Sequence, residues 1–214
     1  MAHLWFGHAV GWNSYRDQWM SEGFSNLAAS IFLQGAYPKE PQRFRDYWKK
    51  MLASITEKNQ SGFRPNDVGP LTQGYRLNTG RTGNVAQDLI YPKGAYVLHM
   101  LRMMMWNRDE GDTKFKAMLR DFIATHRNSP VTTEDFRAIV EKHMLQEMDP
   151  NGERTMNWFF NQYVYGTELP TYRLQPSVSN QGGHTMLTLK LTQSGVSDGF
   201  RMLVPYTSSF RMDG

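Results

Sequence analysis

The first residues in the sequence that could do chemistry together are His3 and Glu22, which are separated by eighteen residues. Imidazole nitrogens and carboxylate oxygens are both common zinc ligands. The two side chains can meet if His3 lies near the end of one helix and Glu22 near the start of the next. This spacing is weak evidence by itself, because most His–Glu pairs in proteins bind no metal. On these residues alone, a zinc site and a pair without any role both stay open.

A second group of interest is the phenol of Tyr91, which opens the segment Tyr91-Pro92-Lys93-Gly94-Ala95. A tyrosine hydroxyl can donate a hydrogen bond to a developing oxyanion. It can equally find a partner inside an ordinary core. The residue type alone does not choose between these two interpretations.

Two segments, in the same order, resemble the zinc signature of the alanyl-aminopeptidase (gluzincin) family, the family of aminopeptidase N and leukotriene hydrolase. That signature is H-E-x-x-H, then eighteen residues, then a liganding Glu inside a W-x-x-E-G-F block. His3 matches the second His, and Glu22 lies at the required spacing inside such a block. A later segment resembles the family's Y-x-K-G-A. The matching segments are Ala2–His8, Tyr15–Ser25, Tyr91–Ala95 with Val97-Leu98, and, less closely, Phe159–Pro170.

The resemblance implies a zinc-dependent aminopeptidase with Zn2+ as its cofactor. His3 and Glu22 would be metal ligands, and three such protein ligands leave a fourth position on a catalytic zinc for water. Tyr91 would donate a hydrogen bond to the oxyanion that forms at the scissile carbonyl. The implied substrate is a peptide with a free N-terminus, which loses one residue at a time.

The resemblance also implies that part of the site lies outside this sequence. The first His of the motif belongs four positions before His3, and the general-base Glu follows that His, so both fall before Met1. The family's G-x-M-E-N segment and its N-terminal β-domain are not among the 214 residues either. We therefore expect a C-terminal fragment that begins inside H-E-x-x-H, with weak or no zinc binding and negligible turnover by this chain alone.

Composition and charge exclude several other classes. The formal charge is +4, but Lys and Arg are scattered among Asp and Glu, so we expect a solvated surface and no nucleic-acid partner. The absence of Cys excludes disulfides, thiolate zinc sites and a cysteine nucleophile. No apolar run approaches the roughly 20 residues that span a bilayer, and no signal peptide is visible. The sequence assigns no compartment.

Other features that suggest sites have simpler explanations. We expect a packing or supporting role for His8, and interface positions for His99 and His143. Two acidic stretches lack the ligand spacing of a calcium loop and are predicted turns. One glycine-rich stretch lacks the Gly-Lys-Ser/Thr ending of a phosphate loop. These three stretches are residues 109–112, 149–153 and 80–83.

Apolar residues at helical spacing predict a mainly helical chain up to Gly166. Residues 1–12 are predicted to be a helix end that turns at Gly7 and Gly11, and residues 60–88 a loop with five Gly and two Pro. The remaining helices are predicted at about 17–34, 40–57, 92–107, after a cap at Asp112, after a cap at Thr132 or Thr133, and at about 153–165. The predicted strands are 172–174, a half-buried strand at 184–191, and 200–205.

The fold class expected from these elements and the resemblance is mainly α. It is the helical lobe of a thermolysin-like catalytic domain (1–166), followed by a small β-sandwich portion (167–214). A hypothesis from another class is a non-catalytic helical module that binds a peptide or a protein. Large exposed apolar surfaces tend to associate, so we also expect a homodimer that buries residues near His3 or the 60–88 loop.

Overall fold

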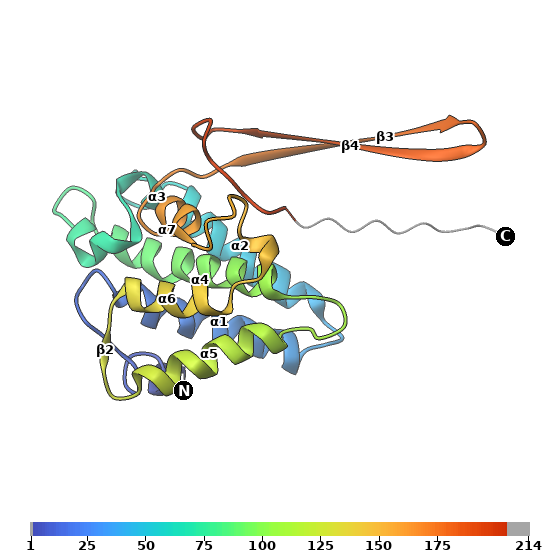
Figure 1. Ribbon diagram of the computed structural model, residues 1–214. Coiled ribbons are helices and arrows are strands. Elements are labelled where there is room, and N and C mark those ends of the chain that lie inside the picture. Colours follow the sequence, from blue (N-terminus) through green and yellow to red (C-terminus); the bar gives the residue numbers. More distant parts are fainter. Residues whose placement is uncertain (1, 205–214) are drawn as a thin grey trace. The chain divides into compact units, whose positions relative to one another are not determined.

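The computed structural model describes residues 2–204, apart from the side chain of Gln181 (Figure 1). These residues form two compact units. One comprises the chain up to Thr167 together with the stretch from Leu203, and it is helical. The other is Glu168–Met202, and it is a β-hairpin.

The helical unit is a succession of helices joined by short connections, as the apolar stripes predict. In chain order its elements are η1 (Ala2–Leu4), β1 (Gly11–Trp12), α1 (Gln18–Ala36), α2 (Pro41–Thr56), α3 (Pro65–Val68), η2 (Leu71–Leu77), α4 (Val85–Met105), α5 (Thr113–His126), β2 (Pro130–Val131), α6 (Thr133–His143), η3 (Gln146–Met148) and α7 (Asn157–Tyr163). Helices η1, η2 and η3 are short 3-10 segments.

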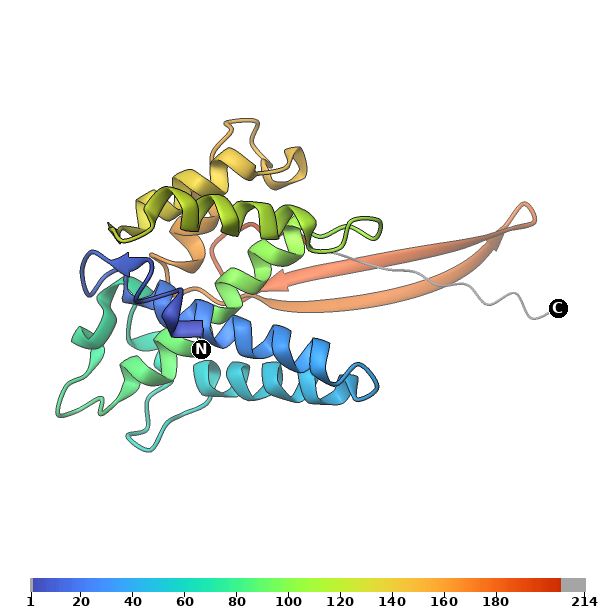
Figure 2. The ribbon, with the colours of Figure 1, turned by 90° about the horizontal axis from the view of Figure 1, so that it is seen from below.

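Helices α1, α2 and α4 pack against one another. Gly23 of α1 contacts Gly94 of α4, and further along both helices Arg102 donates to Gln34, so α1 and α4 run parallel. The hydroxyl of Tyr47 in α2 donates to the backbone oxygen of Asn26 in α1 at 2.9 Å. Figure 2 shows α1 and α2 side by side, in blue and cyan.

Helix α4 begins at Val85, seven residues before the predicted start at Pro92, so that prediction was wrong. Proline lacks an N–H group, which leaves the carbonyl four residues earlier without its helical partner. That carbonyl belongs to Asp88, and the hydroxyl of Ser54 in α2 donates to it at 3.1 Å. The neighbouring helix therefore supplies the hydrogen bond that Pro92 cannot, and α4 continues through the proline.

A cluster of phenylalanine rings joins α1 to α5 and α6. The ring of Phe24 stacks on Phe6 at a centroid distance of 4.1 Å and meets Phe136 edge-on at 5.5 Å. Phe122 of α5 lies 6.0 Å from Phe24 and 5.1 Å from Phe136. Phe24, Phe122 and Phe136 are all buried, so this cluster holds α5 and α6 against α1.

The helix starts predicted at Asp112 and Thr132 are confirmed, but only Thr132 acts through its own side chain. Thr132 and Asp135 form a reciprocal capping box at the start of α6. Asp112 precedes α5 without capping it, because its carboxylate accepts two hydrogen bonds from Arg102, at 2.8 and 2.6 Å.

Two segments differ from their predictions. Residues 60–88 are not one loop, because they contain α3, η2 and the first turn of α4. The start of the chain forms the single 3-10 turn η1, followed by β1, which pairs in parallel with β2. The turn predicted at Gly7 is present, with a φ of 118° that favours glycine.

The second unit contains β3 (Thr171–Gln181) and β4 (His184–Ser194), paired antiparallel. Gly182 and Gly183 both have positive φ, as a two-residue hairpin turn of this kind requires. The strand predicted at 184–191 is confirmed as part of β4, but its predicted half-burial was wrong, since Met186, Leu189 and Leu191 are exposed. Residues 200–204 form no strand, and Pro205 lies outside the described residues.

Candidate metal and catalytic site

The side chains of His3 and Glu22 lie close together near the start of the chain. His3 lies on η1, and Glu22 lies in the second turn of α1. Nε2 of His3 is 3.5 Å from Oε2 of Glu22. The side chain of His3 is 51% exposed, whereas that of Glu22 is only 11% exposed. The structure therefore brings together the two residues that the sequence motif singles out.

The chemistry of this pair fits a zinc ion. Within the described part of the chain, the buried Oε2 of Glu22 has no hydrogen-bond partner. A buried carboxylate oxygen without a partner is costly, and a bound cation would satisfy it. Two ligand atoms on a tetrahedral zinc, each about 2.0–2.2 Å from the metal, lie about 3.4 Å apart. The observed 3.5 Å matches that separation.

The other nitrogen of His3 faces Ser21, the residue before Glu22. The distance from Nδ1 of His3 to the hydroxyl oxygen of Ser21 is 3.5 Å. That hydroxyl donates to the backbone oxygen of Phe6 at 2.9 Å. A Cβ on Gly7 would lie 2.7 Å from the same hydroxyl oxygen, so only glycine leaves room for this contact. Ser21 thus helps to hold the His3 turn on α1, with Nε2 toward Glu22.

Tyr91 reaches Glu22 because α1 and α4 cross at two glycines. A Cβ on Gly23 would lie 2.7 Å from the carbonyl carbon of Gly94. Glu22 precedes the first glycine, and Tyr91 lies one helical turn before the second. Burial raises the pKa of the Tyr91 hydroxyl well above its ordinary value, with further contributions from the hydroxyl of Tyr75 and the carboxylate of Glu22. His3 lies 3.5 Å from Glu22, and the Glu22 carboxylate acts on the pKa of Tyr91, so Glu22 is the common neighbour of the other two.

Tyr75 is a residue at this place that sequence reasoning missed. It lies on η2, in the segment predicted to be a structureless loop, and its interaction with Tyr91 helps to keep Tyr91 protonated. Gly74 beside it has a φ of 54°, and a Cβ there would lie 2.5 Å from the backbone oxygen of Tyr15. The only signal in the sequence was this glycine, because no periodic pattern marks the segment.

Lys93 and Asn66 fix the chain that leaves α7. Lys93 is 3% exposed, and its ammonium group donates to the backbone oxygen of Gly166 at 3.0 Å. Burial lowers the pKa of Lys93 to about 8. The side-chain amide of Asn66, which is also buried, donates to the backbone oxygen of Thr167. In the segment Tyr91–Ala95, the lysine therefore anchors the end of α7 and the glycine forms the helix crossing.

The start of α1 is held by a buried carboxylate. Asp17 accepts hydrogen bonds from the backbone nitrogen and the hydroxyl of Thr133, at 2.8 and 3.0 Å. Its second oxygen accepts from Ser14 at 2.8 Å. The indole of Trp19 also donates to the Thr133 hydroxyl, at 3.1 Å. These bonds join the first turns of α1 and α6 and fix the helix that carries Glu22.

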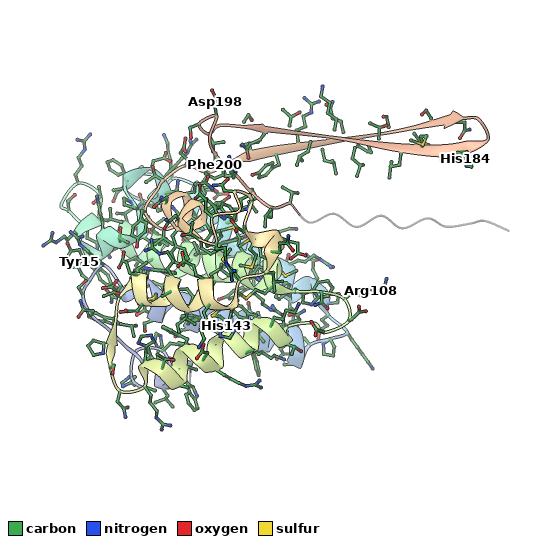
Figure 3. All side chains as sticks on the ribbon, viewed as in Figure 1. Tyr15, Arg108, His143, His184, Asp198 and Phe200 are labelled. Atoms are coloured by element: carbon green, nitrogen blue, oxygen red, sulfur yellow. The ribbon has the colours of Figure 1, made fainter. Side chains whose placement is uncertain are left out.

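The other histidines lie apart from this constellation. His8 is exposed in the turn before β1, so the predicted packing role is not seen. His99 stacks on Trp48 at a centroid distance of 4.4 Å, between α2 and α4. His143 of α6 lies 2.7 Å from Asp121 of α5 and is labelled in Figure 3. The described residues hold no cluster of three or more His, Cys, Asp and Glu side chains that could bind a metal ion.

Comparisons with known sequences find related proteins. Residues 1–163 match the Peptidase family M1 domain. Aminopeptidase N of Haemonchus contortus is 26% identical over 196 residues, which cover 91% of this chain and 18% of that protein. Human aminopeptidase O is 22% identical over 165 residues, covering 69% of this chain and 19% of that protein. The chain thus spans about a fifth of the length of these curated relatives.

Solved structures show the same fold. The M1 zinc metallopeptidase from Deinococcus radiodurans matches with a TM-score of 0.54 at 23% identity, over 79% of this chain and 32% of that chain. A mutant of that protein bound to a Tyr-Ser-Ala substrate matches with a TM-score of 0.53 at 24% identity and the same coverage. In the part of the chain that the structure describes, no helix is both long and apolar enough to cross a membrane.

Proposed function

The chain belongs to peptidase family M1, and from that premise we propose that it carries part of the active site of a zinc-dependent aminopeptidase. His3 and Glu22 are two of its zinc ligands, and Tyr91 is its oxyanion donor. The observation that carries the proposal is the buried Oε2 of Glu22, which has no hydrogen-bond partner among the described residues and lies 3.5 Å from Nε2 of His3.

Each of these residues has a defined task in this scheme. Nε2 of His3 and the carboxylate of Glu22 hold the metal, which when bound polarises a carbonyl and activates water. Tyr91 stays protonated at neutral pH, because its pKa lies above the ordinary value. Its hydroxyl can therefore donate to the oxygen of a scissile carbonyl as negative charge develops there. The substrate is a peptide with a free N-terminus, as the names of the relatives suggest.

The 214 residues supply two metal ligands of the three that such a zinc needs. The motif places the remaining histidine and the general-base glutamate before residue 1, where this sequence has no residues. We propose that the chain alone binds zinc weakly and does not turn over substrate. A chain extended upstream, with the G-x-M-E-N segment, the N-terminal β-domain and His-Glu directly before Met1, has the full H-E-x-x-H spacing.

The test is metal analysis together with hydrolysis of an aminoacyl-anilide, run on the 214-residue chain and on the extended chain. We expect about one zinc per extended chain and activity in that chain only, lost in its Glu22→Gln variant. An extended chain that folds but holds no zinc and shows no activity would contradict the proposal.

A second candidate is the non-catalytic binding module. It is favoured by the exposed Leu4 and Trp5 next to His3, which are 63% and 55% exposed. Exposed apolar residues of this size are typical of interaction surfaces. The same residues favour the homodimer expected near His3. A solution molar mass of one chain at high concentration would argue against that dimer, and a metal-free, inactive extended chain would favour the module.

A further inference from the structure

Two guanidinium groups lie against a single tyrosine, Tyr15, in the helical unit. The Cζ atom of Arg76 is 4.2 Å from the centroid of the Tyr15 ring, and that of Arg16 is 5.8 Å away. Nε of Arg16 also donates to the Tyr15 hydroxyl at 3.2 Å. Figure 3 labels Tyr15 at one edge of the helical unit. Stacking on this ring therefore holds two like charges near each other.

No carboxylate of the described residues lies within ion-pair distance of either arginine. The acidic groups whose charge acts on Arg16 are Asp17 and Glu134. Asp17 is already occupied by Ser14 and Thr133, and Glu134 accepts from the Tyr165 hydroxyl. The hydrogen bond from Arg16, with the positive charges of Arg16 and Arg76, lowers the pKa of the Tyr15 hydroxyl. Neither guanidinium group is therefore paired with a carboxylate within residues 2–204, and both can accept an anion as a partner.

The arginine pair is connected to the candidate active site through η2. Gly74, Tyr75 and Arg76 are consecutive residues, and Gly74 rests on the backbone of Tyr15. Tyr75 turns toward Tyr91, while Arg76 stacks on Tyr15. Neighbouring Cα atoms are about 3.8 Å apart, and an extended peptide of four residues spans about 13 Å. Arg76 is therefore the chain neighbour of the residue that interacts with Tyr91, which makes a peptide of a few residues the ligand to test.

We propose that Arg16 and Arg76 bind a carboxylate of the peptide substrate, a few residues beyond its amino end. The proposal rests on the proposed function for the site at His3, Glu22 and Tyr91. Guanidinium groups pair with carboxylates through parallel hydrogen bonds, which gives this site its chemical preference. The substrate's own α-ammonium group is a cation and is repelled here. The arginines therefore favour short peptides with a free C-terminus, or peptides with an acidic side chain at that distance.

The test is binding of Tyr-Ser-Ala, as the free acid and as the C-terminal amide, to the 214-residue chain at low salt without zinc. Because both guanidinium–carboxylate contacts are exposed, we expect only about tenfold tighter binding of the acid. We expect this preference to disappear in the Arg16→Gln/Arg76→Gln double variant. It should persist in Arg81→Gln, which removes an arginine that lies over a different ring, that of Phe63, at 5.8 Å.

Further binding measurements show whether the arginines bind the terminal carboxylate, an acidic side chain or any small anion. An amidated peptide with Glu in third position, compared with its Gln counterpart, shows whether an acidic side chain replaces the terminal carboxylate. Acetate and inorganic phosphate show whether any small anion suffices. Should the double variant fail to fold, Arg76→Lys, which keeps the charge but loses the parallel hydrogen bonds, is expected to weaken the acid preference severalfold.

Equal affinity for the acid and amide forms would overturn the inference, as would an unchanged preference in the double variant, or acetate binding as tightly as the peptide acid. The readout needs no metal, so it is independent of the zinc proposal. A preference for acids in a chain that never binds zinc would leave the arginine site standing and remove the peptidase function. A working zinc site without the preference would remove only the arginine site.

Discussion

Gly23 of α1 and Gly94 of α4 touch so closely that neither position has room for a methyl group. A Cβ on Gly23 would lie 2.7 Å from the carbonyl carbon of Gly94, and a Cβ on Gly94 would lie 2.9 Å from the backbone oxygen of Trp19. The obstructing atoms are backbone, so they cannot turn aside as a side chain would. This contact fixes the distance between the helix that carries Glu22 and the helix that carries Tyr91.

Gly94→Ala is expected to destabilise the protein by about 1–3 kcal/mol, because the added methyl overpacks the crossing. This is the opposite of what helix propensity predicts, since alanine is about 1 kcal/mol better than glycine in a helix interior. The measurement is the urea midpoint at constant m-value. Gly35→Ala in α1 is the matched control, because a Cβ there meets no atom within 4 Å. A neutral Gly94→Ala variant would contradict the close crossing.

Ser54→Ala is expected to lower the free energy of unfolding by about 1 kcal/mol. Pro92 cannot donate to the Asp88 carbonyl, so without the Ser54 hydroxyl that carbonyl has no hydrogen bond. The reason can be tested by a double-mutant cycle with Pro92→Ala, which restores an N–H group four residues after Asp88. The loss caused by Ser54→Ala should then be smaller in the Pro92→Ala background. Equal losses in both backgrounds would show that the serine has another role.

The buried Lys93 predicts that stability rises with pH above about 8. Its folded-state pKa is about 8, against an ordinary value of 10.5. Between these values the unfolded chain binds more protons than the folded chain, so the free energy of unfolding increases with pH. The rise should be on the order of 1–3 kcal/mol. It should be absent in Lys93→Met and retained in Lys50→Met, which changes an exposed lysine. Denaturant unfolding between pH 7.5 and 10 measures it.

His99 predicts a loss of stability on the acid side. Burial lowers its pKa to about 4, and the charge of Arg102 adds to that effect, against an ordinary value of 6.5. The unfolded chain therefore binds the extra proton first, and stability falls as the pH drops from about 6.5 to 4.

His99→Phe should flatten the pH profile in that window, because the new ring can still stack on Trp48. His8→Phe, at an exposed position, should not flatten it. Asp121 acts mainly below this window, because hydrogen bonds from Lys142 and His143 lower its pKa from an ordinary 3.8 to about 2, and stability changes between those values. A wild-type profile without a slope between pH 6.5 and 4 would contradict the buried, neutral His99.

Periodic apolar residues were sufficient to predict most of the helices. α1 and α2 begin and end close to their predicted positions, and α6 begins where it was predicted, because each buries a stripe of apolar side chains. The start of α4 was missed because Pro92 suggests a helix start. The helix continues through Pro92 because the hydroxyl of Ser54, far away in the sequence, donates to the Asp88 carbonyl. The exposure of β4 was missed because an alternating pattern shows that one face is apolar, but not what covers it.

The candidate site also contains residues that the sequence predicts and residues that only the folded chain reveals. His3, Glu22 and Tyr91 stand in motifs whose spacing can be recognised, so they were predicted as a group. Tyr75 stands in a segment without a period, and only its contact with Tyr91 across the fold reveals it. The pairing of Arg16 with Arg76 is equally invisible in sequence, because 59 residues lie between them and Tyr15 joins them only in the folded chain.

The most direct test of the zinc proposal is a titration of the 214-residue chain with Zn2+, followed by NMR of its six histidine side chains. We predict that the Nε2 signal of His3 responds at the lowest zinc concentration, ahead of the other five, and that Glu22→Gln removes this lead. If His3 responds no earlier than exposed His8, or if Glu22→Gln leaves its response unchanged, His3 and Glu22 do not form a metal site.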